Sequence, residues 1–336
     1  MNRVLVIGGC GFVGSMLVAQ LLEQQRPVRV LDLSPFPDDR VESIVGDMCH
    51  DADVLAACRD VITVFLCAAY IDWGWGNIER VWAVNARGAQ NVVRACLAGG
   101  VSRLIYTSTV DVVFDGTPIS NGDESLPYPD HHLDEYGASK ALGEQIVLLA
   151  HSSQLATCAL RLGGVYGPND GTRLPALIAA GRVMPIPRFG DGSARFTHIY
   201  VENAAHAHLL AEQHLTFESV LSGQAYFIVD EHPENFYRFL APLLAEVGVN
   251  MATRGIPTRL IYGLALVSEA WYRLMRHPSK PALTRYTVLS TCVDFWFTSA
   301  KAQHDFGYQP LVGYAEGLRR TTAWLHTTYG QHEHHG

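Results

Sequence analysis

The sequence has no pair of cysteines in CxxC spacing and no block of basic residues. Its seven cysteines are an odd number at scattered spacings, which argues against a disulfide framework and indicates a reducing compartment such as the cytoplasm. The formal net charge is −8, from 33 acidic and 25 basic residues that are interspersed along the chain. We therefore expect no nucleic-acid partner, because proteins bind nucleic acid through clustered lysine and arginine.

The chain also lacks an apolar run long enough to cross a membrane. The strongest candidate, residues 257–277 (PTRLIYGLALVSEAWYRLMRH), is uncharged only over 260–268, far short of the roughly 20 residues that a bilayer requires. The spacing predicts an amphipathic helix. We favour a buried packing role for it over a cover for a substrate pocket or peripheral contact with a membrane. The N-terminal sequence enters a predicted strand at once, so no signal peptide is expected.

What the sequence does have is a regular alternation of strand and helix patterns. Predicted buried strands cover residues 4–7, 28–33, 43–45, 61–67, 103–106 and 157–162, and predicted helices cover 12–25, 51–59, 77–98 and 134–151. This alternation predicts an α/β fold with a doubly wound parallel sheet, the Rossmann arrangement. With 336 residues, 48% of them hydrophobic, the chain is large enough for this unit and a smaller C-terminal substrate-binding region.

The sequence also predicts where these two parts begin and end. The glycine–proline break GGVYGP, residues 163–168, marks a change of topology after the sixth predicted strand. We assign residues 1–165 to the dinucleotide-binding domain, with a returning strand and helix near 196–229. Residues 166–195 and 230–330 form the predicted substrate-binding region, and the tail 331–336 (QHEHHG) is predicted to be disordered.

A glycine-rich turn follows the first predicted strand. Gly8, Gly11 and Gly14 stand in GxxGxxG spacing, with Phe12 and Val13 opening the next helix. In a dinucleotide fold these positions exclude side chains because the chain turns tightly and the diphosphate approaches the backbone. The diphosphate is then bound by N–H groups at the helix N-terminus.

An acidic residue closes the second predicted strand at the distance that this fingerprint requires. The carboxylate of Asp32 would accept hydrogen bonds from the adenosine ribose and repel a 2′-phosphate, which predicts NAD rather than NADP. Arg40 is near enough in sequence to leave NADP as the alternative. Asp47 is expected beside the adenine, with a solvated loop aspartate as the other interpretation. Further expected cofactor contacts at strand ends are Met48, Cys67, Ala68, Ala69, Thr107 and Ser108.

The segment YGASK, residues 136–140, provides a candidate for proton transfer. Tyr136 and Lys140 are four residues apart and so lie on the same face of a predicted helix. A phenol has an ordinary pKa near 10. A neighbouring ammonium and a positive nicotinamide ring would both lower it, which makes Tyr136 the candidate general base. A Tyr–Lys pair on a solvated helix face is the alternative.

Other polar residues are candidates for the same site. The strand LIYTSTVDVV ends in hydroxyl side chains that are able to hold a substrate oxygen, and we choose Thr109 with Ser108 in reserve. Asn85 is a candidate to bind the backbone or a water beside Lys140, and a purely structural amide is the other interpretation. No metal site is expected, because the histidines near 131 and in the tail have no second set of ligands.

Together these segments resemble the extended short-chain dehydrogenases/reductases, specifically the 3β-hydroxysteroid dehydrogenase and decarboxylating sterol-4α-carboxylate 3-dehydrogenase family. The resemblance runs through GGCGFVG, VNARGAQNVV, YTSTVDVVFDG, NGDESLPYP, YGASKALGEQIVL, LRLGGVYGP, FTHIYVENAAHAHLLA, GQAYFIVDE and LTRYTVLSTCVDFWFTSAKAQHDFGYQP. It implies that Thr109 is the catalytic hydroxyl, Tyr136 the base and Lys140 the cofactor-anchoring lysine. It further implies that Gly163, Gly164 and Val165 pack on the nicotinamide.

The chain also departs from this family's pattern. Thr109 stands where the steroid enzymes usually have serine, and Leu162 replaces the proline that usually precedes the nicotinamide turn. The longer apolar anchor of membrane-bound relatives is missing around Ile261, so a soluble or peripherally bound enzyme is expected. The resemblance also implies a homodimer formed through the helices predicted at 77–98 and 134–151.

The function expected from this resemblance is NAD(P)-dependent interconversion of a secondary alcohol and a ketone on a bulky apolar substrate. A 3β-hydroxysteroid or a sterol-4-carboxylate fits, and in the second case the product is a β-keto acid that loses CO₂ readily. Tyr70, Trp73 and Trp75 are candidates to line the apolar pocket beside Thr109, with ordinary loop packing as the alternative.

Two other functions remain as alternatives. The wider superfamily includes nucleotide-sugar epimerases and dehydratases, but Val110 replaces the first of the two acids that dehydratases carry, and only Asp111 remains. A non-catalytic dinucleotide sensor is the other alternative. Such sensors often lack the tyrosine or the lysine, and both are present here.

Overall fold

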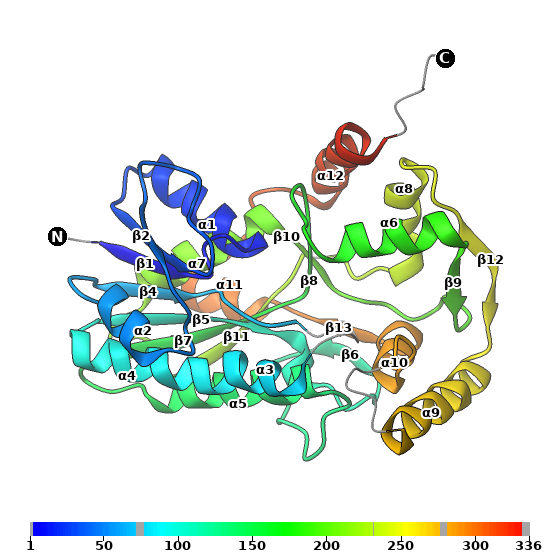
Figure 1. Cartoon of the computed structure of the whole chain (residues 1–336), viewed down its shortest axis with the longest axis horizontal. Coiled ribbons are helices and arrows are strands. Elements are labelled where there is room, and N and C mark those ends of the chain that lie inside the picture. Colours follow the sequence, from blue (N-terminus) through cyan, green and yellow to red (C-terminus); the bar gives the residue numbers. More distant parts are fainter. Residues whose placement is uncertain (1–2, 72–76, 231, 276–280, 331–336) are drawn as a thin grey trace.

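The computed structural model describes residues 3–71, 77–230, 232–275 and 281–330. Its centre is a seven-stranded sheet in the order β11-β7-β5-β4-β1-β2-β3, with every neighbouring pair parallel (Figure 1). The strands are β1 (Val4–Ile7), β2 (Val28–Asp32), β3 (Glu42–Val45), β4 (Thr63–Leu66), β5 (Arg103–Thr109), β7 (Ala156–Leu162) and β11 (Gln224–Ile228). The predicted doubly wound parallel sheet is confirmed.

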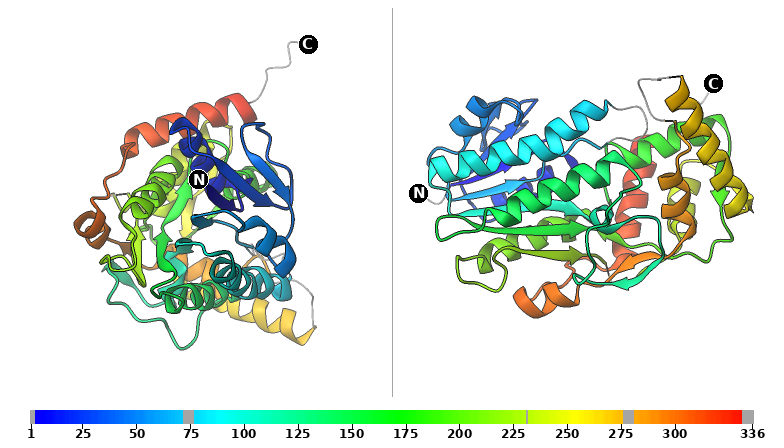
Figure 2. Two further views of the ribbon diagram at one scale, coloured as in Figure 1. Left: turned by 90° about the vertical axis from the view of Figure 1, so that its left-hand side faces the viewer. Right: turned by 90° about the horizontal axis from the view of Figure 1, so that it is seen from below.

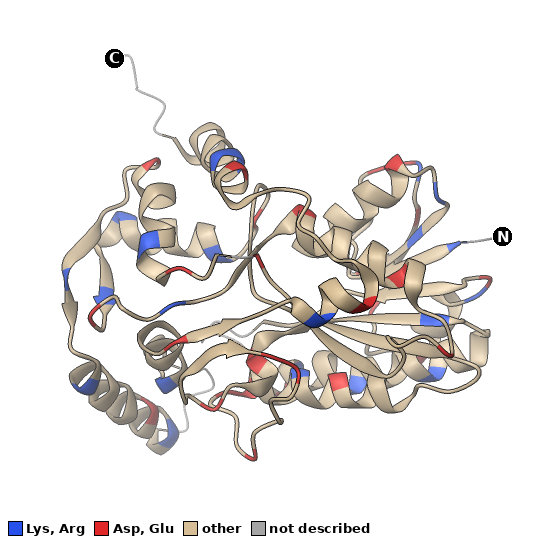
Figure 3. Ribbon diagram, turned by 180° about the vertical axis from the view of Figure 1, so that it is seen from behind, with Lys and Arg blue, Asp and Glu red and all other residues tan. Residues whose placement is uncertain are grey.

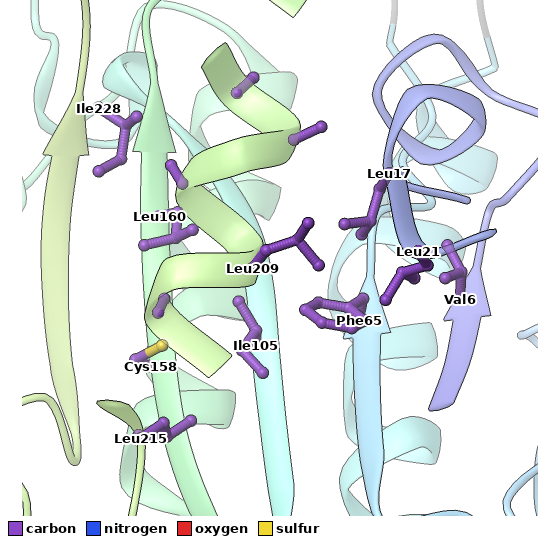
Figure 4. Packing of buried hydrophobic residues seen from close by; sticks show 14 of the residues in the cluster. Val6, Leu17, Leu21, Phe65, Ile105, Cys158, Leu160, Leu209, Leu215 and Ile228 are labelled. Carbon is purple, nitrogen blue, oxygen red and sulfur yellow. The ribbon is translucent and has the colours of Figure 1, made fainter. Parts of the chain in front are cut away.

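The sheet forms because its inner strands are apolar on both sides and helices cover both faces, whereas the edge strand β3 is largely exposed. One face carries α1 (Phe12–Glu23) and α7 (Val201–His214), and the other carries α2 (Asp51–Ala57), α4 (Ala89–Gly99) and α5 (Glu135–Leu149). Figure 4 shows the first of these layers, where Leu17 and Leu209 project from α1 and α7 towards Phe65. Such burial is the main stabilising contribution, about 1.5–3 kcal/mol for each large apolar side chain.

The helix predicted over 77–98 has an irregular centre. It consists of α3 (Ile78–Trp82), a π-helical turn (Ala83–Gly88) and then α4. Gly143 of α5 packs against this turn, where an added Cβ would lie 2.2 Å from the carbonyl oxygen of Asn85. The wider turn and the glycine together let α5 approach the segment between α3 and α4 closely.

A smaller region lies beyond the carboxyl ends of the strands. Its elements are β6 (Ile119–Gly122), β8 (Gly164–Tyr166), α6 (Arg173–Val183), β9 (Ile186–Phe189), β10 (His198–Tyr200), α8 (Phe236–Ala245), β12 (Met251–Ile256), α9 (Thr258–Leu274), α10 (Arg285–Cys292), β13 (Phe295–Phe297) and α12 (Tyr314–Tyr329). Six of these strands pair in three two-stranded sheets, β10-β8, β12-β9 and β13-β6. Between these elements the chain returns to the main sheet, where it forms α7, β11 and α11 (Ala300–Phe306).

The expectation that residues 257–277 form a buried packing helix is wrong. Residues 258–274 form α9, which lies at the outer edge of the smaller region and is largely exposed (Figure 2). The sequence pattern is amphipathic as predicted. Ile261 and Ala265 pack against Val288 of α10, whereas Leu264 and Val267 are exposed. No helix within the described residues has the length and apolarity needed to pass through a bilayer. Charged side chains of both signs are interspersed over the elements of both parts (Figure 3).

Candidate active site

A cleft of about 620 Å³ runs along the carboxyl ends of the strands, between the sheet and the smaller region. Open α/β sheets bind ligands at this edge. The cleft is lined by every residue predicted to contact the cofactor: Gly8, Gly11, Phe12, Val13, Gly14, Asp32, Asp47, Met48, Cys67, Ala68, Ala69, Thr107, Ser108, Tyr136, Lys140, Gly163, Gly164 and Val165. It is also lined by Tyr70 and Thr109.

The glycine-rich turn has the geometry that a diphosphate requires. Gly8 has a φ of +85°, and an added Cβ would lie 2.5 Å from the backbone nitrogen of Ala68. A Cβ on Gly14 would lie 2.1 Å from the carbonyl oxygen of Gly8. Gly11 caps α1 without a side chain, so the first amides of the helix are left open to a ligand. These residues fit a dinucleotide.

The carboxylate of Asp32 is fixed at the end of β2. It accepts hydrogen bonds from the backbone N–H of Cys10 at 2.9 Å and of Leu33 at 2.7 Å. Arg40, the residue that left NADP open, is largely exposed and pairs with Asp38 at 2.6 Å. Nothing therefore directs its guanidinium to the position that a 2′-phosphate would occupy next to Asp32.

Asp47 is also on the cleft wall, and it has a partner that the sequence did not reveal. Its carboxylate accepts a hydrogen bond from Arg80 of α3 at 2.8 Å and one from the backbone N–H of Cys49 at 2.9 Å. Because this aspartate is paired and lines the cleft, the interpretation as an ordinary solvated loop residue is wrong.

Tyr136 and Lys140 share a face of α5, but the ammonium does not activate the phenol in this structure. Lys140 Nζ donates to the carbonyl oxygen of Thr107 at 2.7 Å and lies 4.0 Å from the ring centroid of Tyr106. Burial lowers the pKa of Lys140 to about 7, against a smaller opposing effect of Glu144. The Lys140 ammonium, which was expected to act on Tyr136, is thus less often protonated and donates its hydrogen bond to the end of β5.

The pKa of Tyr136 is accordingly raised, not lowered. Burial is the largest cause, the charges of Asp111 and Asp134 add to it, and the hydroxyl of Thr109 opposes it. The expectation that the neighbouring ammonium makes this phenol acidic is wrong for the protein alone. Desolvation outweighs the effect of Lys140, so only a further positive charge in the cleft would lower the pKa.

Thr109 belongs to a hydrogen-bonded group that includes two residues missed from the sequence. Its Oγ1 donates to Asp111 Oδ2 at 2.6 Å, and the hydroxyl of Tyr286 in α10 donates to Asp111 Oδ1 at 2.7 Å. Burial raises the pKa of Asp111. Tyr286 is 150 residues away from Tyr136. It lies in the segment LTRYTVLSTC, and the resemblance assigned no role to it. Ser108, the reserve candidate, has its hydroxyl oxygen buried with no hydrogen-bond partner among the described residues.

The remaining candidates lie apart from this group. Asn85 is buried behind the cleft wall, where its amide binds the backbone N–H and C=O of Tyr70 at 2.8 and 3.0 Å and the hydroxyl of Ser139 at 3.1 Å. Of the two interpretations, this geometry favours the one in which Asn85 binds backbone and positions Tyr70. Trp73 and Trp75 lie outside the described residues, as does the tail 331–336.

Comparison with known proteins agrees with this geometry. The profile of the 3-beta hydroxysteroid dehydrogenase/isomerase family matches residues 5–257. A 2-alkyl-3-oxoalkanoate reductase of Stenotrophomonas maltophilia (strain K279a) is 35% identical over 326 residues, which cover 96% of this chain and 98% of the reductase. A decarboxylating sterol-4-alpha-carboxylate 3-dehydrogenase of Mus musculus is 35% identical over 331 residues, which cover 97% of this chain and 91% of the mouse protein.

The fold is also that of solved structures. MoeE5 in complex with UDP-glucuronic acid and NAD has a TM-score of 0.73 and 23% identity, and the match covers 97% of this chain and 99% of MoeE5. At this level of identity the likeness establishes the shared architecture, not a shared substrate.

Proposed function

The chain belongs to the 3-beta hydroxysteroid dehydrogenase/isomerase family, as its motifs predicted, and is an NAD-dependent oxidoreductase; we propose that it interconverts a secondary alcohol and a ketone on a sterol-like substrate. The observation that carries this proposal is that Thr109, Tyr136 and Asp111 meet at the end of the cleft where Gly163 and Gly164 follow β7. That is the end opposite the adenosine-binding residues, where the reactive ring of a bound dinucleotide would lie.

The roles that we propose for the side chains follow from their positions. NAD, when bound, would supply the acceptor for a hydride from the carbinol carbon and a positive charge. Tyr136 acts in its deprotonated form: its phenolate oxygen takes the proton of the substrate hydroxyl. Thr109 binds the substrate oxygen, and Lys140 anchors the cofactor ribose. In the reverse direction Tyr136 returns the proton to the ketone oxygen.

A carboxylate on the adjacent carbon would add a second step. Oxidation then gives a β-keto acid, in which the C–C bond to the carboxylate breaks, its electron pair moves towards the ketone and CO₂ leaves. The enolate that remains takes up a proton. The names of the two relatives described above both contain a carboxylate: a sterol-4-alpha-carboxylate in the mouse protein and a 2-alkyl-3-oxoalkanoate in the bacterial reductase.

The two alternative functions have less support. Sugar-nucleotide chemistry is suggested by solved structures below 25% identity, which share the fold alone, and Val110 stands where dehydratases have an acid. A non-catalytic sensor would not need Tyr136, Lys140 and Thr109 together in one cleft.

A substrate panel tests the proposal. NADH formation would be measured with 3β-hydroxysteroids, 4-carboxysterols and sugar nucleotides. NADH consumption would be measured with β-keto acids, which are already ketones. We expect turnover of the sterol-like alcohols and a kcat/KM at least about 10-fold higher with NAD than with NADP, because Asp32 repels a 2′-phosphate. Activity on sugar nucleotides alone would contradict the proposed substrate class, and a strong NADP preference would contradict the role of Asp32.

We further propose that α9 rests on a lipid surface. Six side chains form an exposed apolar stripe at helical spacing: Leu260, Leu264, Val267, Trp271, Leu274 and Met275. Val267 is 67% and Leu274 is 76% exposed, which is unusual for a stripe of this length. Arg259 and Arg273 lie at the two ends of the helix, where they are able to bind anionic headgroups.

Flotation with liposomes that contain anionic lipid tests this contact. We expect the protein to float with the liposomes and the double variant Leu264→Glu/Val267→Glu to stay in solution, because two charges in the stripe oppose its insertion. Val220→Glu, an equally exposed apolar position far from α9 in sequence, is the matched control. Flotation that is absent, or that is unchanged in the double variant, would contradict the proposal.

We also propose that the dimer implied by the family resemblance forms through the predicted helices 77–98 and 134–151, which include α4 and α5. These helices lie side by side on one face of the sheet (Figure 2) and expose Leu97, Leu142 and Leu149. We expect light scattering to give the mass of a dimer, and Leu142→Glu/Leu149→Glu to give that of a monomer, because the charges would be buried at the interface. A monomeric natural protein would refute this.

A further inference from the structure

One cation that lines the cleft has a guanidinium nitrogen without a hydrogen-bond partner in the part of the chain that the structure describes. Arg173 is the first residue of α6 and lines the cleft, and its Nη2 is buried without a hydrogen-bond partner among the described residues. The other two cations that line the cleft are satisfied: Arg80 pairs with Asp47, and Lys140 donates to the carbonyl oxygen of Thr107. A buried guanidinium nitrogen without an acceptor is costly, so its position indicates a ligand that supplies one.

The nearest carboxylate in sequence is already engaged elsewhere. Asp170 is buried and accepts hydrogen bonds from the backbone N–H groups of Thr172, Arg173 and Leu174 at 2.8, 2.9 and 3.1 Å. It therefore caps α6, and no ion pair with the Arg173 side chain is found in the described part of the chain. Asp170 still contributes a favourable field, which together with Tyr286 opposes the effect of burial on the pKa of Arg173.

Packing holds the guanidinium in place. Its Cζ lies 5.1 Å from the ring centroid of Phe236, which is a cation–π distance. On another side it lies against Gly164, where an added Cβ would be 2.9 Å from Nη1. Gly164 thus leaves the space that the guanidinium occupies, and the arginine is fixed before any ligand arrives.

The position of Arg173 indicates that its ligand belongs to the substrate rather than to the cofactor diphosphate. Gly164 follows β7, and β7 is separated from β1 by β5 and β4 in the sheet. At about 4.8 Å between strands, the glycine-rich turn after β1 is about 14 Å away from this end of the cleft. Arg173 lines the same cleft as Tyr286, whose hydroxyl donates to Asp111 beside Thr109. An anion bound here would belong to the molecule whose oxygen Thr109 holds.

We propose that Arg173 binds a carboxylate of the substrate, attached to the carbon next to the reacting carbinol, so that the enzyme selects β-hydroxy carboxylates over the same alcohols without the carboxylate. A guanidinium matches a carboxylate because two parallel N–H groups meet its two oxygens. This inference rests on the proposed function, since it assigns the substrate class of the same site. It makes Arg173 a specificity-determining residue and gives it no part in proton transfer.

The test compares two substrates and three proteins. The substrates are a 3β-hydroxysterol with a 4α-carboxylate and the same sterol without it, and the proteins are the natural chain, Arg173→Met and Arg182→Met. Methionine keeps the unbranched apolar stem of Arg173. Arg182 lies on the same helix, where its Nη2 donates to the carbonyl oxygen of Tyr329 at 3.1 Å, and serves as the matched control.

We expect Arg173→Met to lower kcat/KM for the carboxylated sterol by on the order of 100-fold, through KM. The other sterol should change by less than about 3-fold, and Arg182→Met should leave both unchanged. An equal loss on both sterols, or a higher KM for NAD, would overturn the inference. If the natural protein oxidises neither sterol, the proposed function fails. Calorimetric binding of the two sterols to the natural protein and to Arg173→Met then decides the inference separately, because equal affinities would overturn it.

Discussion

Replacing Tyr136 with phenylalanine is expected to reduce kcat for alcohol oxidation by about 10³-fold or more while the protein stays folded. General base catalysis typically contributes 10²–10⁴-fold, and Tyr136 is the residue to which we assign the acceptance of the hydroxyl proton. The change removes one hydroxyl group and leaves the ring, so the packing of α5 is retained. Steady-state oxidation rates, with thermal unfolding as a check on the fold, measure the effect.

The pH dependence provides a control for this variant. Burial and the charges of Asp111 and Asp134 raise the pKa of Tyr136, so the oxidation rate of the natural protein should increase as pH rises through the alkaline range. Tyr136→Phe should lose that increase together with the rate. A variant that turns over substrate at the natural rate, or that keeps the alkaline increase, would refute the assignment of Tyr136 as the base.

Replacing Lys140 with methionine is expected to lower kcat/KM by about 10²-fold or more, because the cofactor ribose loses its proposed anchor. The same change is expected to stabilise the protein without cofactor. Lys140 is buried, and its ammonium has a carbonyl oxygen and a ring face as partners but no paired carboxylate. An apolar chain of similar length avoids the cost of burying that charge.

The pH dependence of this stabilisation has a definite sign. Burial lowers the pKa of Lys140 from 10.5 to about 7. Between these two values the unfolded chain holds a proton that the folded protein does not, so the free energy of unfolding rises with pH across this window. Lys140→Met lacks this titration, and its gain in Tm should therefore be larger at pH 6.5 than at pH 9.

A matched control for the lysine variant lies outside the cleft. Lys301 is also partly buried, and it donates to Gln224 and to the carbonyl oxygen of Ala225. Lys301→Met should leave kcat/KM within about 2-fold of the natural value, because it does not touch the cleft residues. If Lys140→Met proves less stable than the natural protein at both pH values, the contacts with Thr107 and Tyr106 outweigh the cost of burial and our argument is wrong.

The parts of the site that could be read from the sequence are those encoded locally. The glycine turn, Asp32 and the Tyr136–Lys140 pair each follow a strand or lie on one helix, and their spacing follows from the geometry of that element. The sheet could be predicted for the same reason, because strands buried on both faces appear as continuous apolar runs.

The rest depends on contacts between segments that are distant in the chain. Arg80, Arg173 and Tyr286 reach the cleft through the packing of α3, α6 and α10, and no spacing rule connects them with the glycine turn. The pKa of Lys140 follows from burial, which a motif does not specify. For α9 the amphipathic pattern could be predicted, but the sequence does not show how much of the apolar surface another element covers. The helix packs on α10 through Ile261 and Ala265 and is otherwise largely exposed.

The course of the chain between the sheet and the smaller region has a consequence for engineering. The chain leaves the sheet after β7, returns to form α7 and β11, leaves again after β11, and returns once more to place α11 on the sheet. The smaller region is thus tethered by several separate connections. A chimaera that carries the corresponding region of a relative would need several segments to be exchanged together. A single exchange point after β7 would also replace β11, the edge strand that pairs with β7.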